Sequence, residues 1–207
     1  ITAVAHGRVG VAALLVETGE IVAINETSHY PMHSVYKMLI AMAVLNKIEN
    51  ASLSLTQKIH IEESDIFGRT GAPIRQKYPH GGVDLTIREL LEYMVTHSDG
   101  VASDILLRVL GGPSQITKYL RDLGITEIDV VTTEREQGQD EKTQYRNWAT
   151  PIAMTELLGK LQSGAVLSES HRELLLHLMT ITPYWRTRIR GLLPEGTPVA
   201  SKSGSSG

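Results

Sequence analysis

The first apolar positions of the chain form two short runs that are separated by a polar turn. Residues 9–16 and 21–24 are mostly apolar, and residues 17–20 between them read Glu-Thr-Gly-Glu. Two apolar runs joined by a short polar segment with a glycine are typical of a β-hairpin. We therefore predict that a sheet begins in this part of the chain.

The longest apolar stretch follows a polar loop and opens at Ser34. Residues 35–45 are apolar on nearly every side beyond the first turn. A helix that is hydrophobic all round is normally buried. The pattern predicts a buried helix that starts at Ser34.

Capping signals recur through the middle of the chain. Capping-box spacings, glycine stops and prolines at first helical positions occur at Thr86-Ile87-Arg88-Glu89, Gly111-Gly112-Pro113, Thr150-Pro151 and Ser170-His171-Arg172-Glu173. Each of these patterns marks a helix boundary. We expect helices from residue 86, over residues 101–110, from residue 113, from residue 151 to near residue 164, and from residue 170.

One connection is longer than usual. Residues 132–147 are polar and show neither a helical nor a strand period. Loops of this length inside a compact domain are usually functional or disordered. We therefore expect a functional role for this loop.

Strand-like patterns at both chain ends enclose the helical segments. Residues 197–202 have a strand-like pattern, as does the expected hairpin at the start. We predict an α+β fold with an antiparallel sheet built from both chain ends and packed with helices, plus an all-helical subdomain. The sheet-containing part would comprise residues 1–33 and 165–207, and the helical part residues 34–164. A cleft between them is the expected place for a site.

Composition narrows the possible partners. The 207 residues are 42% hydrophobic and 21% charged, with a net charge of −3, as in a soluble globular protein. The lysines and arginines are scattered along the chain, so no basic cluster indicates binding to nucleic acid or to an anionic membrane. No apolar stretch approaches the length of a membrane span. Without cysteine there is no disulfide or thiolate chemistry, and the histidines show no paired metal spacing. We expect a small-molecule partner and no metal or cofactor.

Ser34 and Lys37 have the spacing of a serine nucleophile and its base. In a helix, residues three apart share a face, so the Lys37 amine can receive the Ser34 hydroxyl proton. About 0.6 Ser-x-x-Lys matches are expected by chance at this composition, so the pair by itself is weak. The alternative is an ordinary helix cap followed by a solvated lysine.

Two further elements support the nucleophile reading. Ser98-Asp99-Gly100 follows about sixty residues on, and Lys202-Ser203-Gly204 closes the strand-like stretch. In order and spacing, the three elements resemble the Ser-x-x-Lys, Ser-Asp-Asn and Lys-Thr-Gly boxes of class A β-lactamases and penicillin-binding proteins. The resemblance extends over the whole chain, through Gly10-Val11-Ala12-Ala13, Pro31-Met32-His33 and Asp84-Leu85-Thr86.

The resemblance implies a mechanism for opening a β-lactam ring. Ser34 would attack the lactam carbonyl, while Lys37, or Glu134 through a water, takes its proton. Ser98 would relay a proton to the leaving nitrogen. Counting back from Pro151 places Glu134 at the position of the glutamate that activates water to cleave the acyl-enzyme.

The resemblance also implies the substrate-binding groups. The oxyanion would lie between the backbone amides of Ser34 and Ser205. Lys202 and Ser203, with Gly204 beside them, would hold the substrate carboxylate. His33 and His97, which precede the two serines directly, are expected to pack or to line the cleft.

The sequence departs from the family at several positions. Gly100 stands where the family usually has asparagine, so an amide that would contact the substrate's acylamido group and Lys37 is missing. Gly138 stands where a second asparagine usually holds the deacylation water, so we expect a wetter, wider pocket and slower turnover of some substrates. Thr132 and Asn147 replace the usual Arg–Asp pair at the loop ends, so we expect the loop to be held differently. Residues 144–148 resemble a divergent branch with broadened cephalosporin activity, which favours an extended-spectrum enzyme.

Two other functions remain open at this point. A penicillin-binding DD-peptidase would form the same acyl-enzyme and release it slowly, and a β-lactam sensor would not release it. The family implies a periplasmic or secreted monomer. It also implies a longer first helix, and further strands and a closing helix after the third box, which the printed sequence lacks. The chain is therefore expected to be a fragment or an incompletely represented protein.

Overall fold

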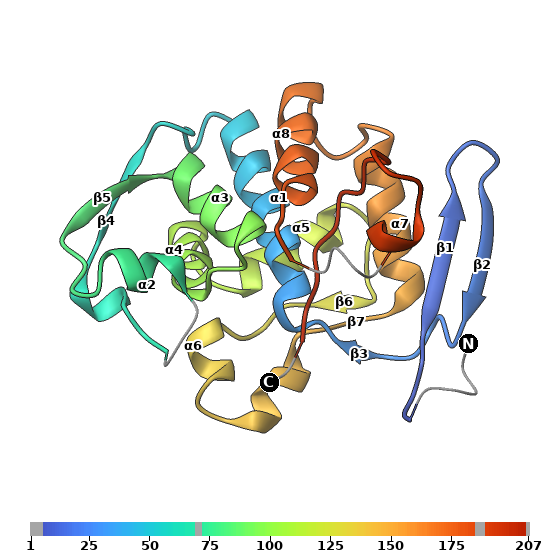
Figure 1. Ribbon diagram of the computed structural model, residues 1–207, viewed down its shortest axis with the longest axis horizontal. Helices are drawn as coiled ribbons and strands as arrows, with labels where there is room; N and C mark the ends of the chain where they lie inside the picture. Colours follow the sequence, from blue (N-terminus) through green and yellow to red (C-terminus); the bar gives the residue numbers. More distant parts are fainter. Residues whose placement is uncertain (1–5, 69–71, 185–188, 206–207) are drawn as a thin grey trace.

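A single buried helix organises the structure around it. The computed structural model describes residues 6–68, 72–184 and 189–205 (Figure 1). Helix α1 (Tyr36–Glu49) runs through the centre. The helices that contact it are α3 (Ile87–Thr96), α4 (Gly100–Leu110), α5 (Ser114–Asp122) and α8 (Glu169–Thr180).

The prediction of a buried helix after Ser34 is confirmed. All residues from Tyr36 to Leu45 are buried. The helix begins two residues later than expected, because Ser34 lies in the preceding 3₁₀ turn η2 (His33–Val35). This turn joins a rigid, fully packed helix directly, so the position of Ser34 is set by the core.

The predicted hairpin is confirmed. Strands β1 (Val11–Leu15) and β2 (Glu20–Ile24) pair antiparallel, and Gly19 has a positive φ in the turn between them. Helix α7 (Pro151–Gln162) packs against β1, where the lack of a side chain at Gly159 makes room for Leu14.

Two more small antiparallel sheets connect distant parts of the chain. One contains β3 (Tyr30–Pro31), β7 (Trp148–Ala149) and β6 (Ile128–Asp129), in the order β3-β7-β6. The other pairs β4 (Lys58–Ile61) with β5 (Val83–Thr86), and between these strands lie η3 (Glu63–Asp65) and α2 (Pro73–Lys77). The first sheet brings residues 147–149 beside the approach to Ser34.

Most predicted helix boundaries are confirmed, and one is wrong. Thr86 caps α3, Thr150 caps α7 and Gly111 ends α4 in a left-handed conformation. The predicted capping box at residues 170–173 does not form, because α8 already begins at Glu169. The N–H of Ser168 donates instead to Glu49 Oε1 (2.6 Å), which also contacts His171 Nδ1 (2.9 Å).

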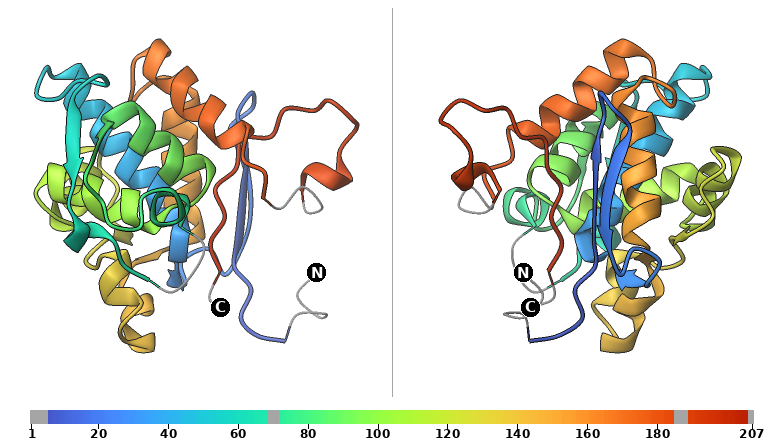
Figure 2. Two further views of the ribbon diagram at one scale, coloured as in Figure 1. Left: turned by 60° about the vertical axis from the view of Figure 1, so that its left-hand side comes forward. Right: turned by 90° about the vertical axis from the view of Figure 1, so that its right-hand side faces the viewer.

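The predicted strand over residues 197–202 is also wrong. This segment follows η5 (Arg190–Leu192) and lies between α8 and the hairpin (Figure 2), but it pairs with no strand in the described residues. Its backbone groups form isolated hydrogen bonds in place of a strand ladder. Ser201 N–H donates to Met179 O (3.1 Å), and Val199 O accepts from Arg190 Nη2 (2.8 Å). The α+β class is confirmed, but no sheet joins the two chain ends in the described part.

No helix in the described ranges is long and apolar enough to cross a membrane. The division into residues 1–33 with 165–207 and residues 34–164 stays a prediction.

Candidate active site

Ser34 and Lys37 meet as the helical spacing predicts. Lys37 lies in the first turn of α1, and its Nζ donates to Ser34 Oγ over 2.9 Å. The lysine side chain is 1% exposed. A buried ammonium needs compensating partners, which identifies the surroundings of Lys37 as the electrostatic centre of the site.

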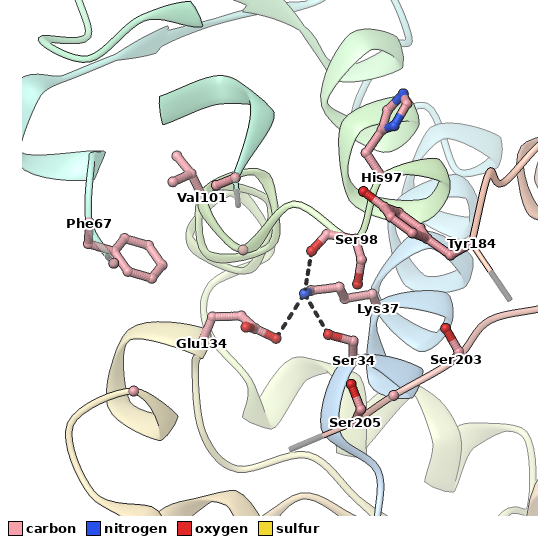
Figure 3. Close-up of a pocket in the computed structure, with 15 residues that line it drawn as sticks. Ser34, Lys37, Phe67, His97, Ser98, Val101, Glu134, Tyr184, Ser203 and Ser205 are labelled. Atoms are coloured by element: carbon pink, nitrogen blue, oxygen red, sulfur yellow. Dashed lines mark hydrogen bonds and ion pairs between the residues drawn. The ribbon is translucent and has the colours of Figure 1, made fainter. Parts of the chain in front are cut away.

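Two more oxygen atoms complete the environment of Lys37. Its Nζ donates to the backbone oxygen of Ser98 (2.8 Å) and lies 3.0 Å from Glu134 Oε1 (Figure 3). An ammonium group has three donors, and here all three point at an oxygen atom. The three predicted catalytic elements therefore meet at one nitrogen atom.

The backbone is strained on both sides of this centre. His33 and Ser98 have φ values of +45° and +58°, a region that residues with a side chain rarely adopt. Such conformations persist only where neighbouring structure holds them. Asp99, which is 1% exposed, does so by accepting from Ala102 N (2.9 Å) and Ile74 N (2.8 Å). The Ser98 turn is thus anchored in the core.

The third sequence box lies on the other side of Ser98. Lys202 Nζ donates to Ser98 Oγ (3.1 Å) and to Ser203 O (2.8 Å). Burial, assisted by the nearby Lys37 cation, lowers the pKa of Lys202 to about 7, against the opposing effect of Glu134. The Ser98 hydroxyl therefore lies beside an amine that can change its charge near neutral pH.

Gly204 lets the third box approach the nucleophile closely. A Cβ atom at this position would lie 2.4 Å from Met32 O and 3.0 Å from Ser34 N. Only glycine fits between these groups without a backbone shift. The backbone of residues 203–205 therefore runs directly against the turn that carries Ser34.

The long polar loop contains more regular structure than its sequence indicates. Residues 132–147 have no helical or strand period in their sequence, yet α6 (Glu134–Gln137) and the 3₁₀ helix η4 (Glu141–Arg146) lie within them. Thr133 and Glu136 form a capping box that starts α6, so local capping outweighs the absence of an apolar face. Glu134 is the first residue of this short helix.

Asp104 of α4 holds the start of α6, and it was not identified as a site residue from the sequence. Its two carboxylate oxygens accept from Glu134 N (2.8 Å) and Arg135 N (3.0 Å). Burial, and secondarily the Glu134 charge, raise the pKa of Asp104 to about 6, although the two backbone donors oppose this rise. The available signal was an acidic residue inside an otherwise apolar helix.

The ends of the loop are joined through one side-chain amide. Asn147 is fully buried, and its Oδ1 accepts from Val131 N (2.8 Å) and Thr132 N (2.9 Å). Its Nδ2 donates to Thr132 O (2.9 Å). The replacement of the usual Arg–Asp pair by Thr132 and Asn147 predicts that the loop ends are held differently. The structure agrees, because amide hydrogen bonds join them where an ion pair would otherwise do so.

These groups surround one cavity of about 450 Å³. Nine of the ten predicted site residues line it: Ser34, Lys37, Ser98, Gly100, Glu134, Gly138, Ser203, Gly204 and Ser205. The tenth, Lys202, reaches it through Ser98. A Cβ atom at Gly100 would lie 3.3 Å from Glu134 Oε2, so the carboxylate occupies the space that a side chain there would need.

The cavity also contains residues that the sequence did not indicate. Phe67, Gly68, Ala72 and Tyr184 line it from segments without a recognisable box, and Val101 lines it directly after Ser98-Asp99-Gly100. His97 lines it as well, in agreement with its expected position in the cleft, whereas burial lowers the pKa of the partly buried His33, against the effect of Glu134. Among the described residues, no three His, Asp or Glu side chains are grouped as metal ligands.

The fold and this cavity define a serine hydrolase class in which lysine and glutamate replace histidine as partners of the nucleophile. Comparison with known proteins agrees with that class. The family model of the beta-lactamase enzyme family matches residues 1–207. The β-lactamase VEB-1 of Pseudomonas aeruginosa is 38% identical over 204 residues, which are 98% of this chain and 68% of that protein. The extended-spectrum β-lactamase PER-1 of the same species is 37% identical over 199 residues, covering 96% and 65%.

Solved structures match over nearly the whole chain. A β-lactamase from Chitinophaga pinensis superposes with a TM-score of 0.96 at 39% identity, covering 99% of this chain and 76% of that one. The TLA-1 extended-spectrum β-lactamase gives a TM-score of 0.93 at 40% identity, covering 97% and 72%. The chain spans about two thirds of the length of the curated relatives it matches. It belongs to the beta-lactamase enzyme family and, within it, to the class A enzymes, which hydrolyse β-lactams.

Proposed function

We propose that this protein hydrolyses penicillins and cephalosporins through an acyl-enzyme on Ser34, with Glu134 assisting its release. The observation that carries the proposal is the shared contact of Ser34, Ser98 and Glu134 with the buried amine of Lys37. A serine hydroxyl is a weak nucleophile until a base accepts its proton. Lys37 lies within hydrogen-bond distance of the Ser34 hydroxyl, and Glu134 lies within the same distance of Lys37, which supports both as candidate bases.

The acylation step follows from these distances. Lys37 can accept the Ser34 proton only as a neutral amine, and Glu134 Oε1 at 3.0 Å can take the proton that Lys37 first carries. The freed oxygen then attacks the lactam carbonyl, and its electron pair forms the new ester bond. Attack by way of a water held by Glu134 would move the proton to the same carboxylate, so either base leaves Glu134 protonated.

The opened ring must receive a proton at nitrogen. Ser98 Oγ supplies it in this proposal as the lactam C–N bond breaks, and the hydrogen bond from Lys202 Nζ supports a hydroxyl that gives up its proton. The proton on Glu134 then returns by way of Lys37 to Ser98, so that Ser98 is again a hydroxyl and Glu134 a carboxylate before the acyl group is released. The backbone N–H groups of Ser34 and Ser205 would stabilise the oxyanion, since developing negative charge is best met by preorganised donors. Lys202 and Ser203, beside Gly204, would bind the substrate carboxylate.

Release of the acyl group distinguishes a hydrolase from a peptidase or a sensor. Glu134 lines the cavity and can take a proton from a water that attacks the ester. Gly138 leaves that water without a side-chain amide to hold it, and Gly100 offers no amide to the substrate or to Lys37, so slower turnover of some substrates remains a prediction. The similarity to proteins named extended-spectrum β-lactamases supports activity on bulky cephalosporins.

Mass spectrometry during turnover tests the proposal. The protein is mixed with a chromogenic cephalosporin, colour release is followed, and acid-quenched samples are weighed and digested. We expect sustained turnover and a transient adduct on the peptide that contains Ser34. A single burst with an adduct that lasts for hours would favour the peptidase or the sensor, and an adduct elsewhere would refute Ser34 as nucleophile.

The charge of Lys202 predicts a pH dependence of substrate binding. Because the pKa of Lys202 is lowered to about 7, its ammonium is present below this pH and is lost as the pH rises through it. KM for a substrate carboxylate is therefore expected to rise several-fold between pH 6 and 9, in steady-state assays. In Lys202→Arg, whose guanidinium stays charged, this rise should disappear. An unchanged rise would show that another group titrates.

The hydrogen bonds from the start of α6 to Asp104 predict that a change at Asp104 slows release of the acyl group. Asp104→Asn keeps one acceptor oxygen but turns an amide donor towards a backbone N–H, so one of two hydrogen bonds to α6 is lost. We expect deacylation to slow by about tenfold, since loss of one hydrogen bond to a charged group is worth about 1.5 kcal/mol or more. Single-turnover measurements should show acylation changed less than deacylation. Equal losses in both steps would contradict a role through Glu134.

We also propose a monomeric protein that acts in the periplasm or outside the cell, on the family resemblance alone. Size-exclusion chromatography with light scattering would test the first part, and cell fractionation the second.

A further inference from the structure

The single phenylalanine of the chain lies in the wall of the cavity. Phe67 lines it, and Figure 3 shows its ring across the cavity from Tyr184, beside Val101 and Glu134. Many other lining side chains are hydroxyls or charged groups, as at Ser34, Lys37 and Ser203. Phe67 and Val101 therefore form an apolar section of the wall.

An arginine holds this ring from the side of the long loop. Arg135 Cζ lies 4.6 Å from the centre of the Phe67 ring, within the range of a cation–π contact. Arg135 Nη2 also donates to Ser64 O (2.5 Å), and its backbone N–H donates to Asp104 (3.0 Å). Both ends of the arginine are thus held, and its guanidinium lies against the partly buried Phe67 ring.

Core packing accounts for only part of this arrangement. Phe67 packs against the hydrophobic core, but it is only partly buried and also lines the cavity, with the exposed Arg135 against its ring. An aromatic ring held in place beside a reacting centre offers a flat surface for another ring. Glu134 lines the same cavity as Phe67, so a ligand on this surface lies in the cavity that holds the carboxylate.

Given the proposed function, we propose that Phe67, held by Arg135, determines specificity by binding the aromatic side chain of β-lactam substrates. The bicyclic lactam reacts at Ser34, and its acyl side chain extends along the wall towards Phe67 and Val101. The preference would appear in KM, because the contact forms equally in the bound substrate and in the transition state.

Two substrates distinguish loss of the contact with Phe67 from a general loss of activity. Benzylpenicillin carries an aromatic side chain, and 6-aminopenicillanic acid has the same bicycle without it. In Phe67→Leu we expect kcat/KM for benzylpenicillin to fall about five- to tenfold, through KM, the size of an aromatic pair contact. The value for 6-aminopenicillanic acid should stay within about twofold, which also shows that the variant folds.

Two further variants complete the test. Arg135→Met keeps the length of the side chain but removes its charge, and should raise KM for benzylpenicillin about two- to threefold. Tyr184→Leu removes a ring from the opposite wall and should leave the ratio of the two substrates unchanged. Equal losses on both substrates in Phe67→Leu, or no loss, would overturn the specificity role while leaving the proposed function intact. A wild-type protein that hydrolyses neither substrate would instead overturn the proposed function.

Discussion

Replacement of Ser34 by alanine is expected to lower kcat/KM for a chromogenic cephalosporin by about 10⁴-fold or more. Without the hydroxyl there is no atom at this position to form the ester, and removal of a serine nucleophile elsewhere has effects of this size or larger. The remaining groups can still bind substrate, so a small residual rate is expected. The measurement is steady-state kinetics together with intact mass, which should show no adduct.

The structure supplies a matched control for this change. Ser205 lines the same cavity, but only its backbone N–H has a proposed role, so Ser205→Ala should keep activity within about fivefold. Ser34→Ala removes one hydrogen bond to Lys37 and leaves no large void, so its melting temperature should lie close to that of the wild type. An active Ser34→Ala protein, or an adduct that still forms on it, would contradict the assignment of the nucleophile.

Replacement of Glu134 by glutamine is expected to stop the reaction at the acyl-enzyme. Glutamine keeps the size of the side chain and its place at the start of α6, but it cannot take a proton from water. General-base catalysis contributes about 10²- to 10⁴-fold, so kcat should fall by about 10³-fold while an adduct accumulates on Ser34. Pre-steady-state mixing should show a burst of one equivalent, followed by very slow turnover.

The same change also affects Lys37. Glu134 is the carboxylate 3.0 Å from the buried Lys37 amine, so its loss removes the opposing charge and an acceptor for the lysine proton. Acylation should therefore slow as well, but less than deacylation. Glu141→Gln, an exposed carboxylate on the same loop, is the control and should leave both steps unchanged. Equal loss of acylation and deacylation in Glu134→Gln would contradict its role in release.

Several parts of this protein could be predicted from the sequence because the forces behind them are local. The spacing of Ser34 and Lys37 places both side chains on one helix face whatever surrounds them. The caps at Thr86 and Thr150 act within one turn, and the apolar residues 35–45 can only be accommodated in a core. Glu134 was located through the family resemblance, and Pro151, which marks the start of the following helix, served as the reference position.

Other parts depended on contacts between residues far apart in the chain. The strand predicted over residues 197–202 does not form in the described structure, because a strand needs a partner ladder and its pattern does not supply one. Asp104 supports α6 from 30 positions earlier, and Phe67 meets Arg135 across an even longer separation. The sequence by itself determined which groups can do chemistry, since that follows from residue type and short spacing. Only the tertiary structure decided which residues hold these catalytic groups in place and which residues shape the cavity. Contacts of that kind arise from packing between distant segments and leave no short-range pattern in the sequence.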